Sequence, residues 1–517
     1  MSAHPPSARR APDGAEGRLH APAPMDALSL FSPMDAEESR RLALVAPGAA
    51  WTFGEMSELA RALAARLEDR GVTRGSRVAL RAAASPEVLL TIATLAAVGA
   101  TIVPIHPRLS PAEARVLVDV TRPDAVLDDT DQLLPSPSEV QDWRAAVTPV
   151  PVSTRSAAEE SAPPFAIVTT SGTSGRPKGA VLSRRAMIAS AEASAQNLGW
   201  EPGDRWLLCM PLAHVGGLSI VTRCLHARRT IVMLPRFEPR AVLDTIRRHD
   251  VTLLSVVPTM LDALFEADTD GVLARPRAIL LGGAAAPKPL LEECARRGVR
   301  ALTTYGLTEA CSQVTCQSPR EPSPREGAIR AGSGAPLAGV EVRIASTTTE
   351  DTAPVPANVT GRILIRGDVL FDGYLRAGGE VDPARVGDGW FETGDLGELD
   401  ETGHLRVLVR RTDLIVTGGE NVYPAEVEQA LERLPGVRRA AVFGVPDARW
   451  GQIVAAAIVA DPGTSTHKLT DLLSTTLAPY KRPRRWAVVE ELPLTSSGKV
   501  QRGALAERFG PQLRPAS

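Results

Sequence analysis

The segment from Thr169 to Ser183 concentrates residue types that bind polyphosphates. It combines three glycines with several Ser and Thr hydroxyls and with the cations Arg176 and Lys178. Glycines let backbone amides approach an anion closely, and the hydroxyls and Lys178 add donors and positive charge. The apolar run 165–168 predicts a buried strand just before it, and open α/β sheets bind ligands at the carboxyl ends of their strands. The segment is therefore a candidate phosphate-binding loop.

Spacing distinguishes this loop from a Walker A motif. That motif needs Gly-x-x-x-x-Gly-Lys-Ser/Thr, whereas Lys178 follows Gly175 by three positions and precedes Gly179. A flexible Gly/Ser linker is the alternative, and it is disfavoured because Pro and Lys are set tightly between a strand-type and a helix-type run. The pattern predicts a helix over 184–198, and we expect its first turn to direct amide groups at the phosphates.

Further turns that follow predicted strands carry side chains suited to binding a nucleotide. There a histidine can line a pocket, glycines admit a flat base, and an aromatic ring can stack on it. A hydroxyl can bond phosphate, and a carboxylate can hold Mg²⁺ or accept ribose hydroxyls. These residues are His214, Gly283, Tyr305, Thr308, Glu309 and Asp395. Taken singly, each also suits a structural role, as does Lys499, an exposed lysine in the turn near the end of the chain.

The hydrophobic pattern indicates which elements position these residues. Strand-type and helix-type runs alternate from Trp51 onward, which predicts parallel strands with right-handed crossovers. Beyond Gly332, short β-type runs with Gly and Pro turns predict a small antiparallel barrel or sheet, in which we include the run Gly373-Tyr374. Two cations interrupt the apolar alternation at 410–413, and a compact α+β tail follows.

These observations place the chain in the α/β class. We expect a large N-terminal domain of βαβ sheets with a small β-barrel, and a small α+β C-terminal domain. The predicted limits are a disordered extension over 1–25, an N-terminal domain over 26–409 with its β-rich part at about 332–409, a hinge at 410–413, and a C-terminal domain over 414–517. A chain of 517 residues is too long for one core, so several domains are expected.

Composition excludes several classes of protein. The net charge is −2 with Lys and Arg spread along the chain, which disfavours nucleic-acid binding. Five cysteines without a Cys-x-x-Cys pair argue against a disulfide framework or a zinc ribbon and favour a cytoplasmic location. The N-terminal stretch lacks the apolar core of a signal peptide. The uncharged run 88–105 has the minimum length for a membrane span, but Gly99 and Pro104 divide it into a helix and a strand.

The motifs, in this order, resemble those of the adenylate-forming superfamily, which includes acyl-CoA and aryl-CoA synthetases, firefly luciferase and the adenylation domains of peptide synthetases. The resemblance covers roughly residues 26 to 508. It implies an ATP-dependent carboxylic acid ligase whose partners are a small carboxylic acid, ATP, Mg²⁺ and coenzyme A. We expect no nucleic acid, no membrane span and a possible homo-oligomer.

The resemblance also assigns roles to individual residues. The phosphate loop matches Thr170, Ser171, Gly172, Thr173, Ser174, Gly175 and Lys178. The adenine wall matches Gly283, Ala284, Ala285, Tyr305 and Gly306. Thr308 matches a phosphate contact, Glu309 and Thr170 match metal contacts, and Asp395 and Arg410 match ribose contacts. Lys499 matches the adenylation lysine, and it joins Lys178, Glu309 and His214 as the candidate catalytic residues.

The implied chemistry explains why such a set is needed. The substrate carboxylate and the α-phosphate are both anionic, so attack requires charge neutralisation and in-line positioning. Lys499, with Mg²⁺ on Glu309, would stabilise the phosphorus centre and the departing pyrophosphate, after which a thiol displaces AMP. In this superfamily the small C-terminal domain is mobile. Its swing about a hinge that matches Thr412 would exchange Lys499 for a CoA-binding segment that matches Gly418, Gly419 and Glu420.

Within the superfamily, the chain most resembles the o-succinylbenzoate-CoA ligases of menaquinone biosynthesis. The resemblance rests on the runs 211–219, 305–313 and 410–415, and Ala213 departs from it because many relatives have Phe there. Expected substrate contacts are His214, Gly217, Arg223 and Ser312. Arg223 is a cation inside an apolar run, where a charge is costly unless paired, so we expect it to bind the aromatic carboxylate.

Three alternatives remain open at this stage. The first is an acyl- or aryl-CoA synthetase for another carboxylic acid, and the second is a stand-alone adenylation enzyme that loads a carrier protein. The third, a nucleotide-binding regulatory protein without turnover, would need a defective Lys499 or Glu309, and both residues are present.

Overall fold

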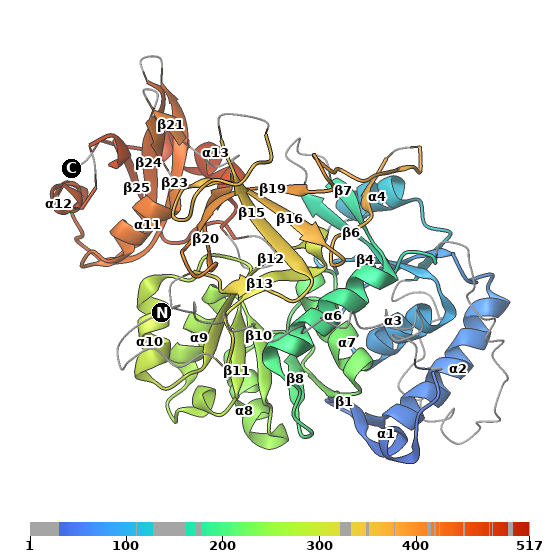
Figure 1. Ribbon diagram of the computed structural model, residues 1–517. Coiled ribbons are helices and arrows are strands. Elements are labelled where there is room, and N and C mark those ends of the chain that lie inside the picture. The colour runs from blue at the N-terminus through green and yellow to red at the C-terminus, as the bar shows by residue number, and fades with distance from the viewer. Residues whose placement is uncertain are drawn as a thin grey trace, which may run out of the picture.

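The computed structural model contains two large sheets, a four-stranded sheet and a five-stranded C-terminal sheet (Figure 1). It describes residues 30, 32–109, 111–127, 162–171, 177–320, 332–347, 351–376, 378–410, 415–417, 420–422, 424–447, 450–474, 476–477, 479–494 and 500–515. The extension predicted over 1–25 and residues 411–413 of the predicted hinge lie outside the described residues.

The nine-stranded sheet has the order β14-β13-β12-β11-β10-β8-β9-β1-β2. Its strands are β1 (Leu42–Ala46), β2 (Ala49–Thr52), β8 (Arg205–Leu208), β9 (Thr230–Met233), β10 (Leu253–Val256), β11 (Ala278–Leu281), β12 (Ala301–Leu307), β13 (Ser312–Cys316) and β14 (Ala335–Pro336). The run from β1 to β12 is parallel, as the alternation of strands and helices predicts. Strands β12, β13 and β14 pair antiparallel at one edge.

The seven-stranded sheet has the order β18-β17-β7-β6-β4-β3-β5. Its strands are β3 (Arg77–Arg81), β4 (Thr101–Ile105), β5 (Ala125–Leu127), β6 (Ala166–Ser171), β7 (Pro177–Leu182), β17 (Gly373–Leu375) and β18 (Val381–Asp382). The prediction that Gly373-Tyr374 belongs to the β-rich part is wrong, because β17 pairs antiparallel with β7. The edge of β7 offers backbone groups that need partners, and a distant segment supplies them.

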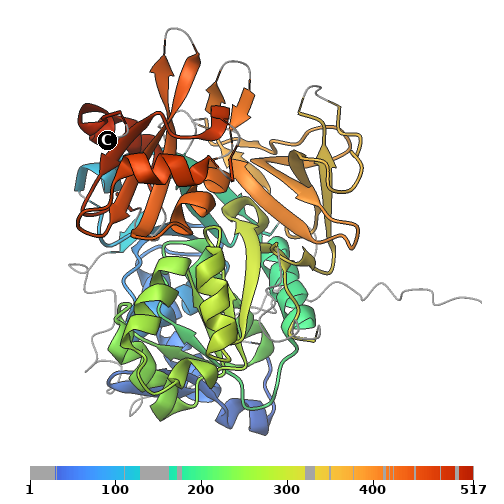
Figure 2. The same ribbon diagram turned by 90° about the vertical axis from the view of Figure 1, so that its left-hand side faces the viewer.

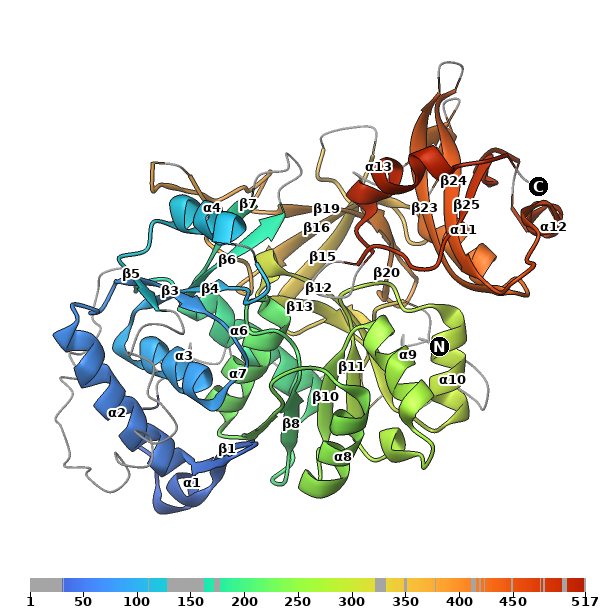
Figure 3. The ribbon, with the colours of Figure 1, turned by 180° about the vertical axis from the view of Figure 1, so that it is seen from behind.

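Helices form three layers around these sheets (Figures 1 and 3). They are α1 (Ala36–Arg40), α2 (Phe53–Asp69), α3 (Pro86–Val98), α4 (Pro111–Thr121), α6 (Arg184–Leu198), α7 (Val215–Ala227), α8 (Pro239–His249), α9 (Pro258–Ala267) and α10 (Lys288–Arg296). One continuous core joins α2, α3, α6 and α7 to the facing sides of both sheets. Helices α8, α9 and α10 cover the other side of the nine-stranded sheet, and α4 covers that of the seven-stranded sheet.

Burial explains the apolar run 88–105. Residues Val88 to Ala96 of α3 are buried, and every residue of β4 is buried in the sheet. The predicted division into a helix and a strand is therefore confirmed. In the described part of the chain, no helix has the length and apolar character needed to cross a membrane.

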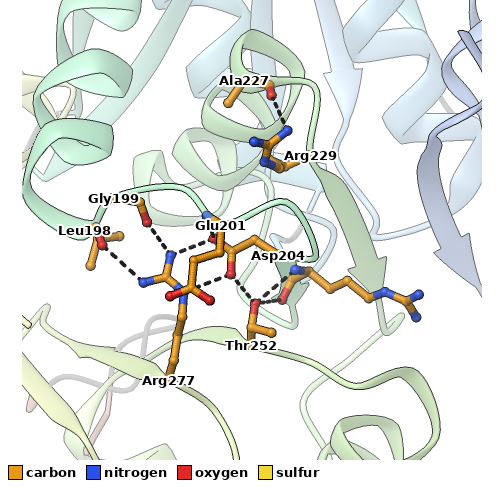
Figure 4. A network of polar contacts seen from close by, with 9 residues as sticks. Leu198, Gly199, Glu201, Asp204, Ala227, Arg229, Thr252 and Arg277 are labelled. Atoms are coloured by element: carbon orange, nitrogen blue, oxygen red, sulfur yellow. Dashed lines mark hydrogen bonds and ion pairs between the residues drawn. The ribbon is translucent and has the colours of Figure 1, made fainter. Parts of the chain in front are cut away.

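A buried ion pair fastens the amino ends of the nine-stranded sheet (Figure 4). Arg277, just before β11, donates from Nε and Nη2 to the Asp204 carboxylate at 2.8 and 2.6 Å and also to the carbonyls of residues 198 and 199. Thr252 donates to the same carboxylate at 2.7 Å. Burial alone would raise the pKa of Asp204, but the bonds from Arg277, the Glu201 amide and Thr252 lower it. The network joins the end of α6 to the starts of β8, β10 and β11.

The remaining strands form two smaller sheets. The antiparallel four-stranded sheet consists of β15 (Val340–Ala345), β16 (Gly361–Gly367), β19 (Phe391–Leu399) and β20 (Leu405–Arg410), as predicted for the β-rich part. The C-terminal sheet consists of β21 (Ile415–Thr417), β22 (Glu420–Val422), β23 (Val437–Asp447), β24 (Gly451–Ala460) and β25 (Arg485–Val488). Its helices are α11 (Pro424–Glu432), α12 (Thr466–Leu473) and α13 (Leu505–Phe509).

The C-terminal domain has its own core on each face of its sheet. It lies above α9 and α10 of the large domain in all three views (Figures 1, 2 and 3). We retain 26–409 and 414–517 as the proposed domain limits. Short 3₁₀ turns complete the described elements: η1 (Val272–Ala274), η2 (Thr308–Ala310), η4 (Pro479–Lys481), η5 (Arg502–Ala504) and η6 (Gly510–Gln512).

Candidate functional site

The predicted phosphate loop lies at the tip of a β-hairpin. Strands β6 and β7 pair antiparallel from Ala166 opposite Leu182 to Ser171 opposite Pro177. Residues 172–176, which include Gly172, Thr173, Ser174 and Gly175, lie outside the described residues. Thr170 pairs with Lys178 near the tip, so a hydroxyl and a cation flank the loop.

The predicted role of the next helix is wrong. Helix α6 spans Arg184–Leu198 as expected, but it begins after β7 has returned along β6, at the opposite end of the hairpin from the loop. Since β7 has six residues, about 20 Å of strand separates them at ~3.3 Å per residue. Instead, the Arg184 guanidinium is buried and donates to the carbonyls of Ala96 and Ala100 at 2.6 and 3.0 Å. The first turn of α6 therefore cannot face the phosphates.

A cation, a phenol and a carboxylate converge beside the hairpin. Nζ of Lys178 lies 5.0 Å from the centre of the Tyr374 ring, within the range of a cation–π contact. The Tyr374 hydroxyl donates to Oε1 of Glu309 at 2.7 Å, and the Phe371 amide donates to the Glu309 carbonyl at 2.8 Å. Glu309 is thereby held next to the hairpin, with Thr308 adjacent in the same turn. Tyr374 is a site residue that the sequence analysis missed.

The predicted adenine and ribose contacts also meet. The Tyr305 hydroxyl donates to Oδ2 of Asp395 at 2.6 Å, and Asp395 is buried in β19 opposite Arg410 of β20. A bulge in the β12–β13 pairing at Tyr305 and Gly306 shapes this region. Only glycine fits at 306, since a Cβ there would lie 1.8 Å from the Ser312 carbonyl oxygen.

The glycine turn after β11 lies next to this pair. Gly283 has a φ of +80°, in the left-handed region that glycine adopts freely, and Gly283, Ala284 and Ala285 are exposed. Because β11 and β12 are parallel neighbours, the turn and Tyr305 lie at the same edge of the sheet. The structure therefore brings together the residues predicted for the adenine wall.

His214 lies where a second histidine approaches it. It is the N-cap residue of α7, and Gly217 in the first turn packs so closely that a Cβ would lie 2.4 Å from the Pro211 carbonyl oxygen. The ring of His106, just after β4, lies 5.4 Å from the His214 ring and is tilted by 40°. Burial and, to a lesser extent, the charge of Arg108 lower the pKa of His106, so this neighbour is uncharged near neutral pH. His106 gave no motif-level signal in the sequence.

Two predicted substrate residues contact one another inside the large domain. Nη2 of Arg223 donates to the Ser312 hydroxyl at 3.3 Å, and its guanidinium lies 5.4 Å from the centre of the Trp206 ring. Arg223 is 3% exposed, and its Nε has no hydrogen-bond partner among the described residues. Burial lowers its pKa to about 10, and the groups that oppose this effect are the Cys316 and Cys224 thiols rather than a carboxylate.

Several predicted residues cannot be compared with the structure. Thr412, Gly418, Gly419 and Lys499 lie outside the described residues. Ser171, Arg410 and Glu420 are placed in strands β6, β20 and β22, but their side chains are not described.

The described carboxylates suit a metal that arrives with its substrate. In the ranges that the structure covers, no group of three or more His, Cys, Asp or Glu side chains could hold a metal ion. Mg²⁺ is commonly bound by one or two carboxylates together with substrate phosphates and water. Glu309, which Tyr374 holds beside the β6–β7 hairpin, fits that kind of site.

The chain matches family models and known relatives along most of its length. Residues 34–375 match the family described as AMP-binding enzyme, and residues 426–499 match its C-terminal domain. The chain belongs to the AMP-binding enzyme family. A relative from Bacillus velezensis, 2-succinylbenzoate–CoA ligase, is 36% identical over 478 residues, which cover 90% of this chain and 95% of the relative.

Two solved structures of the Bacillus subtilis o-succinylbenzoate CoA synthetase resemble this AMP-binding enzyme to different degrees. Its complex with the acyl-adenylate intermediate has a TM-score of 0.79 at 32% identity, covering 92% of this chain and 96% of that one. A double mutant bound to a product analogue has a TM-score of 0.64 at the same identity, covering 92% and 97%.

Proposed function

We propose that this AMP-binding enzyme is an AMP-forming acid–thiol ligase. It converts 2-succinylbenzoate, ATP and coenzyme A into 2-succinylbenzoyl-CoA, a step of menaquinone biosynthesis, in the cytoplasm. The observation that carries the substrate assignment is Arg223, a buried cation with an unsatisfied Nε. An unpaired buried charge is costly, and a ligand carboxylate would relieve that cost. The five cysteines are free and buried, which suits a protein that does not depend on disulfides.

The first half-reaction joins the succinyl carboxylate to the α-phosphate of ATP. The carboxylate oxygen forms a bond to phosphorus, and pyrophosphate leaves. Tyr305 and Asp395 hold the nucleoside, with Asp395 accepting the ribose hydroxyls. Lys178 and the hairpin amides bind the phosphates, and Lys499 neutralises charge at the reacting centre. Glu309 and Thr170 would hold Mg²⁺, which would supply charge neutralisation at the phosphates when bound.

The second half-reaction transfers the acyl group of the adenylate to coenzyme A. The thiol of coenzyme A attacks the acyl carbon, the thiol proton is lost, and AMP leaves with the bonding electrons. We assign to the path to the acyl carbon His214, the N-cap residue of α7, whose ring lies against that of His106 just after β4. Gly418, Gly419 and Glu420 bind coenzyme A when the C-terminal domain swings about Thr412.

The substrate is held at both ends. Arg223, assisted by the Ser312 hydroxyl, binds the aromatic carboxylate, while Gly217 keeps the first turn of α7 close to Pro211, in the turn that precedes the helix. A monocarboxylic acid has no group for Arg223. The arrangement therefore selects a dicarboxylate whose second carboxyl is on the aromatic ring, ortho to the chain that carries the reacting one.

Pyrophosphate release with ATP, Mg²⁺ and coenzyme A tests the proposal. The panel is 2-succinylbenzoate, 4-oxo-4-phenylbutanoate, benzoate, 4-phenylbutyrate and octanoate. We expect turnover confined to 2-succinylbenzoate, since 4-oxo-4-phenylbutanoate differs from it only by the aromatic carboxylate. Preference for octanoate or benzoate would contradict the substrate assignment and favour an acyl- or aryl-CoA synthetase. Adenylate formation without transfer to coenzyme A would favour an enzyme that loads a carrier protein.

A further inference from the structure

One ion pair joins the C-terminal domain to the large domain. Nη2 of Arg439, in β23, lies 2.6 Å from Oδ2 of Asp262, in α9. The two residues are 177 positions apart, and their side chains are 33% and 39% exposed. Burial raises the pKa of Asp262, and the charge of Arg439 opposes that effect. The pair is therefore shielded enough from solvent to stabilise the contact between the domains. It is also exposed enough to separate when the C-terminal domain moves.

A second carboxylate faces the same arginine from within the C-terminal domain. Oε1 of Glu432, at the end of α11, accepts the Ala440 amide at 3.2 Å. Burial raises the pKa of Glu432 to about 7, repulsion by Glu428 and Asp262 adds to the effect, and Arg439 opposes it. Arg439 thus pairs with Asp262 and also attracts Glu432, and these two acidic groups repel one another. Its charge allows the two domain surfaces to approach.

The row of charged contacts continues to Arg502 in η5. Glu428, one helical turn before Glu432, forms a bidentate pair with Arg502 at 2.6 and 2.7 Å. Arg502 also donates to the Val442 carbonyl at 3.1 Å, and it follows Lys499 by three positions. A row of charged groups therefore runs from α9, through β23 and α11, to the turn that follows Lys499.

The orientation that this contact accompanies is indicated by the superpositions. Both solved structures are of the Bacillus subtilis enzyme, and each is 32% identical to this chain and covers 92% of it. The TM-score is 0.79 for the acyl-adenylate complex and 0.64 for the product-analogue complex. Those two structures differ from one another in arrangement, and this chain is nearer to the one that holds the adenylate.

We propose that Arg439 and Asp262 are positioning residues that hold the C-terminal domain, and with it Lys499, in the orientation that forms the acyl-adenylate. The pair breaks when the domain turns for thioester formation. This inference rests on the proposed function for the role of Lys499. The placement of the domain by the ion pair does not depend on which acid is activated.

The test combines a charge swap with a distance measurement. Spin labels on Glu292→Cys in α10 and Lys468→Cys in α12 report the arrangement of the two domains. Both positions are exposed, and the five native cysteines are buried from the reagent. Arg439→Glu should shift or broaden the label distance distribution, and adding Asp262→Arg should restore it. Arg439→Gln provides a milder variant should reversal impair folding.

Half-reaction rates supply the second measurement. We expect Arg439→Glu to slow ATP–pyrophosphate exchange by about three- to tenfold, as for a partly exposed ion pair turned repulsive. Thioester formation from supplied acyl-adenylate should be unchanged or faster. The control is Arg438→Glu, an exposed neighbour whose partner Asp461 lies in its own domain.

Two outcomes would overturn the inference. The first is a label distance distribution in Arg439→Glu or Arg439→Gln that is identical to that of the labelled protein with native Arg439 and Asp262. The second is a double variant, Arg439→Glu with Asp262→Arg, that does not recover the wild-type distance distribution and exchange rate. If the wild-type protein exchanged pyrophosphate with none of the acids, the proposed function would fail instead. The label distances would still decide the role of the ion pair.

Discussion

At Arg223, stability and the proposed function make opposite demands. Its guanidinium is buried against Trp206 with the Ser312 hydroxyl as its hydrogen-bond acceptor, so the folded protein pays for a charge that its own residues do not fully compensate. A buried charge of this kind is typical of a site that is completed by a ligand. Replacement by an apolar residue therefore separates the two demands.

We predict that Arg223→Leu raises the KM for 2-succinylbenzoate by about tenfold or more without lowering the midpoint of thermal unfolding. A lost charge-assisted hydrogen bond is worth about 1.5–3 kcal/mol, whereas removal of an uncompensated buried charge does not destabilise the fold. Steady-state kinetics and a thermal melt measure both quantities. The matched control is 4-oxo-4-phenylbutanoate, whose binding should not change because it lacks the aromatic carboxylate. An unaltered KM for 2-succinylbenzoate would remove Arg223 from the substrate site.

Motif order predicted several residues that the structure places close together, although Tyr305 and Asp395 lie within β12 and β19 rather than after them. Tyr305 contacts Asp395, and Lys178 and Glu309 contact the same tyrosine. That tyrosine, Tyr374, was missed because its place depends on the pairing of β17 with β7, residues that are far apart in the sequence. Side-chain periodicity predicts that a segment is a strand but not which edge it joins.

At the scale of elements, the sequence predicts whether a segment is a helix or a strand better than it predicts the direction in which that element runs. The bounds predicted for α6 are correct, yet its first turn lies at the opposite end of the β6–β7 hairpin from the predicted phosphate loop. The run 177–182 has strand character, but local pattern does not reveal whether it leaves the sheet or folds back on β6. The hairpin forms because its return supplies hydrogen-bond partners for β6.

The Asp204–Arg277 pair holds the starts of β8 and β11 together at a distance from the candidate site. It lies at the starts of β8 and β11, whereas the residues proposed to bind the nucleotide lie at the carboxyl ends of β11 and β12. We predict that Arg277→Met lowers the free energy of unfolding by about 3–5 kcal/mol, because Asp204 would remain buried and unpaired. Urea denaturation measures the loss, and the KM for ATP of the folded fraction should be unchanged.

An exposed pair provides the control for this prediction. Arg247 and Asp270 form an ion pair with side chains that are 39% and 62% exposed. Arg247→Met should cost at most about 1 kcal/mol, since solvent screens such pairs. Equal losses in the two variants would show that the Asp204–Arg277 network does not fasten the strands.

At the scale of the whole molecule, acidic groups collect where the two domains meet. Asp262 approaches from α9, Glu428 and Glu432 lie on α11, and the facing cations are Arg439 on β23 and Arg502 in η5. Glu428 is matched by Arg502, which leaves Arg439 shared between Asp262 and Glu432. The ionisation of Glu432 therefore affects how well the domain surfaces fit.

The pKa of Glu432, raised from 4.5 to about 7, fixes the direction of its pH effect. Below about pH 4.5 the group is protonated in both the folded and unfolded states and has no effect. Between about pH 4.5 and 7 the unfolded chain loses this proton while the folded protein retains it, so the contribution of Glu432 to stability falls as the pH rises. Above about pH 7 the penalty is complete.

We predict that Glu432→Gln gains stability relative to the wild type as the pH rises from about 5 to 8, by on the order of 2 kcal/mol, with most of the change below about pH 7. The difference in free energy of unfolding, measured by urea denaturation across this range, tests the prediction. Parallel curves for the two proteins would contradict it. Asp262→Asn tests the cause, because removal of the repelling carboxylate should lower the pKa of Glu432 and move the change to lower pH. A change that stayed in place would assign the raised pKa to burial and Glu428, both of which lie within the C-terminal domain, and would separate the acidity of Glu432 from domain contact.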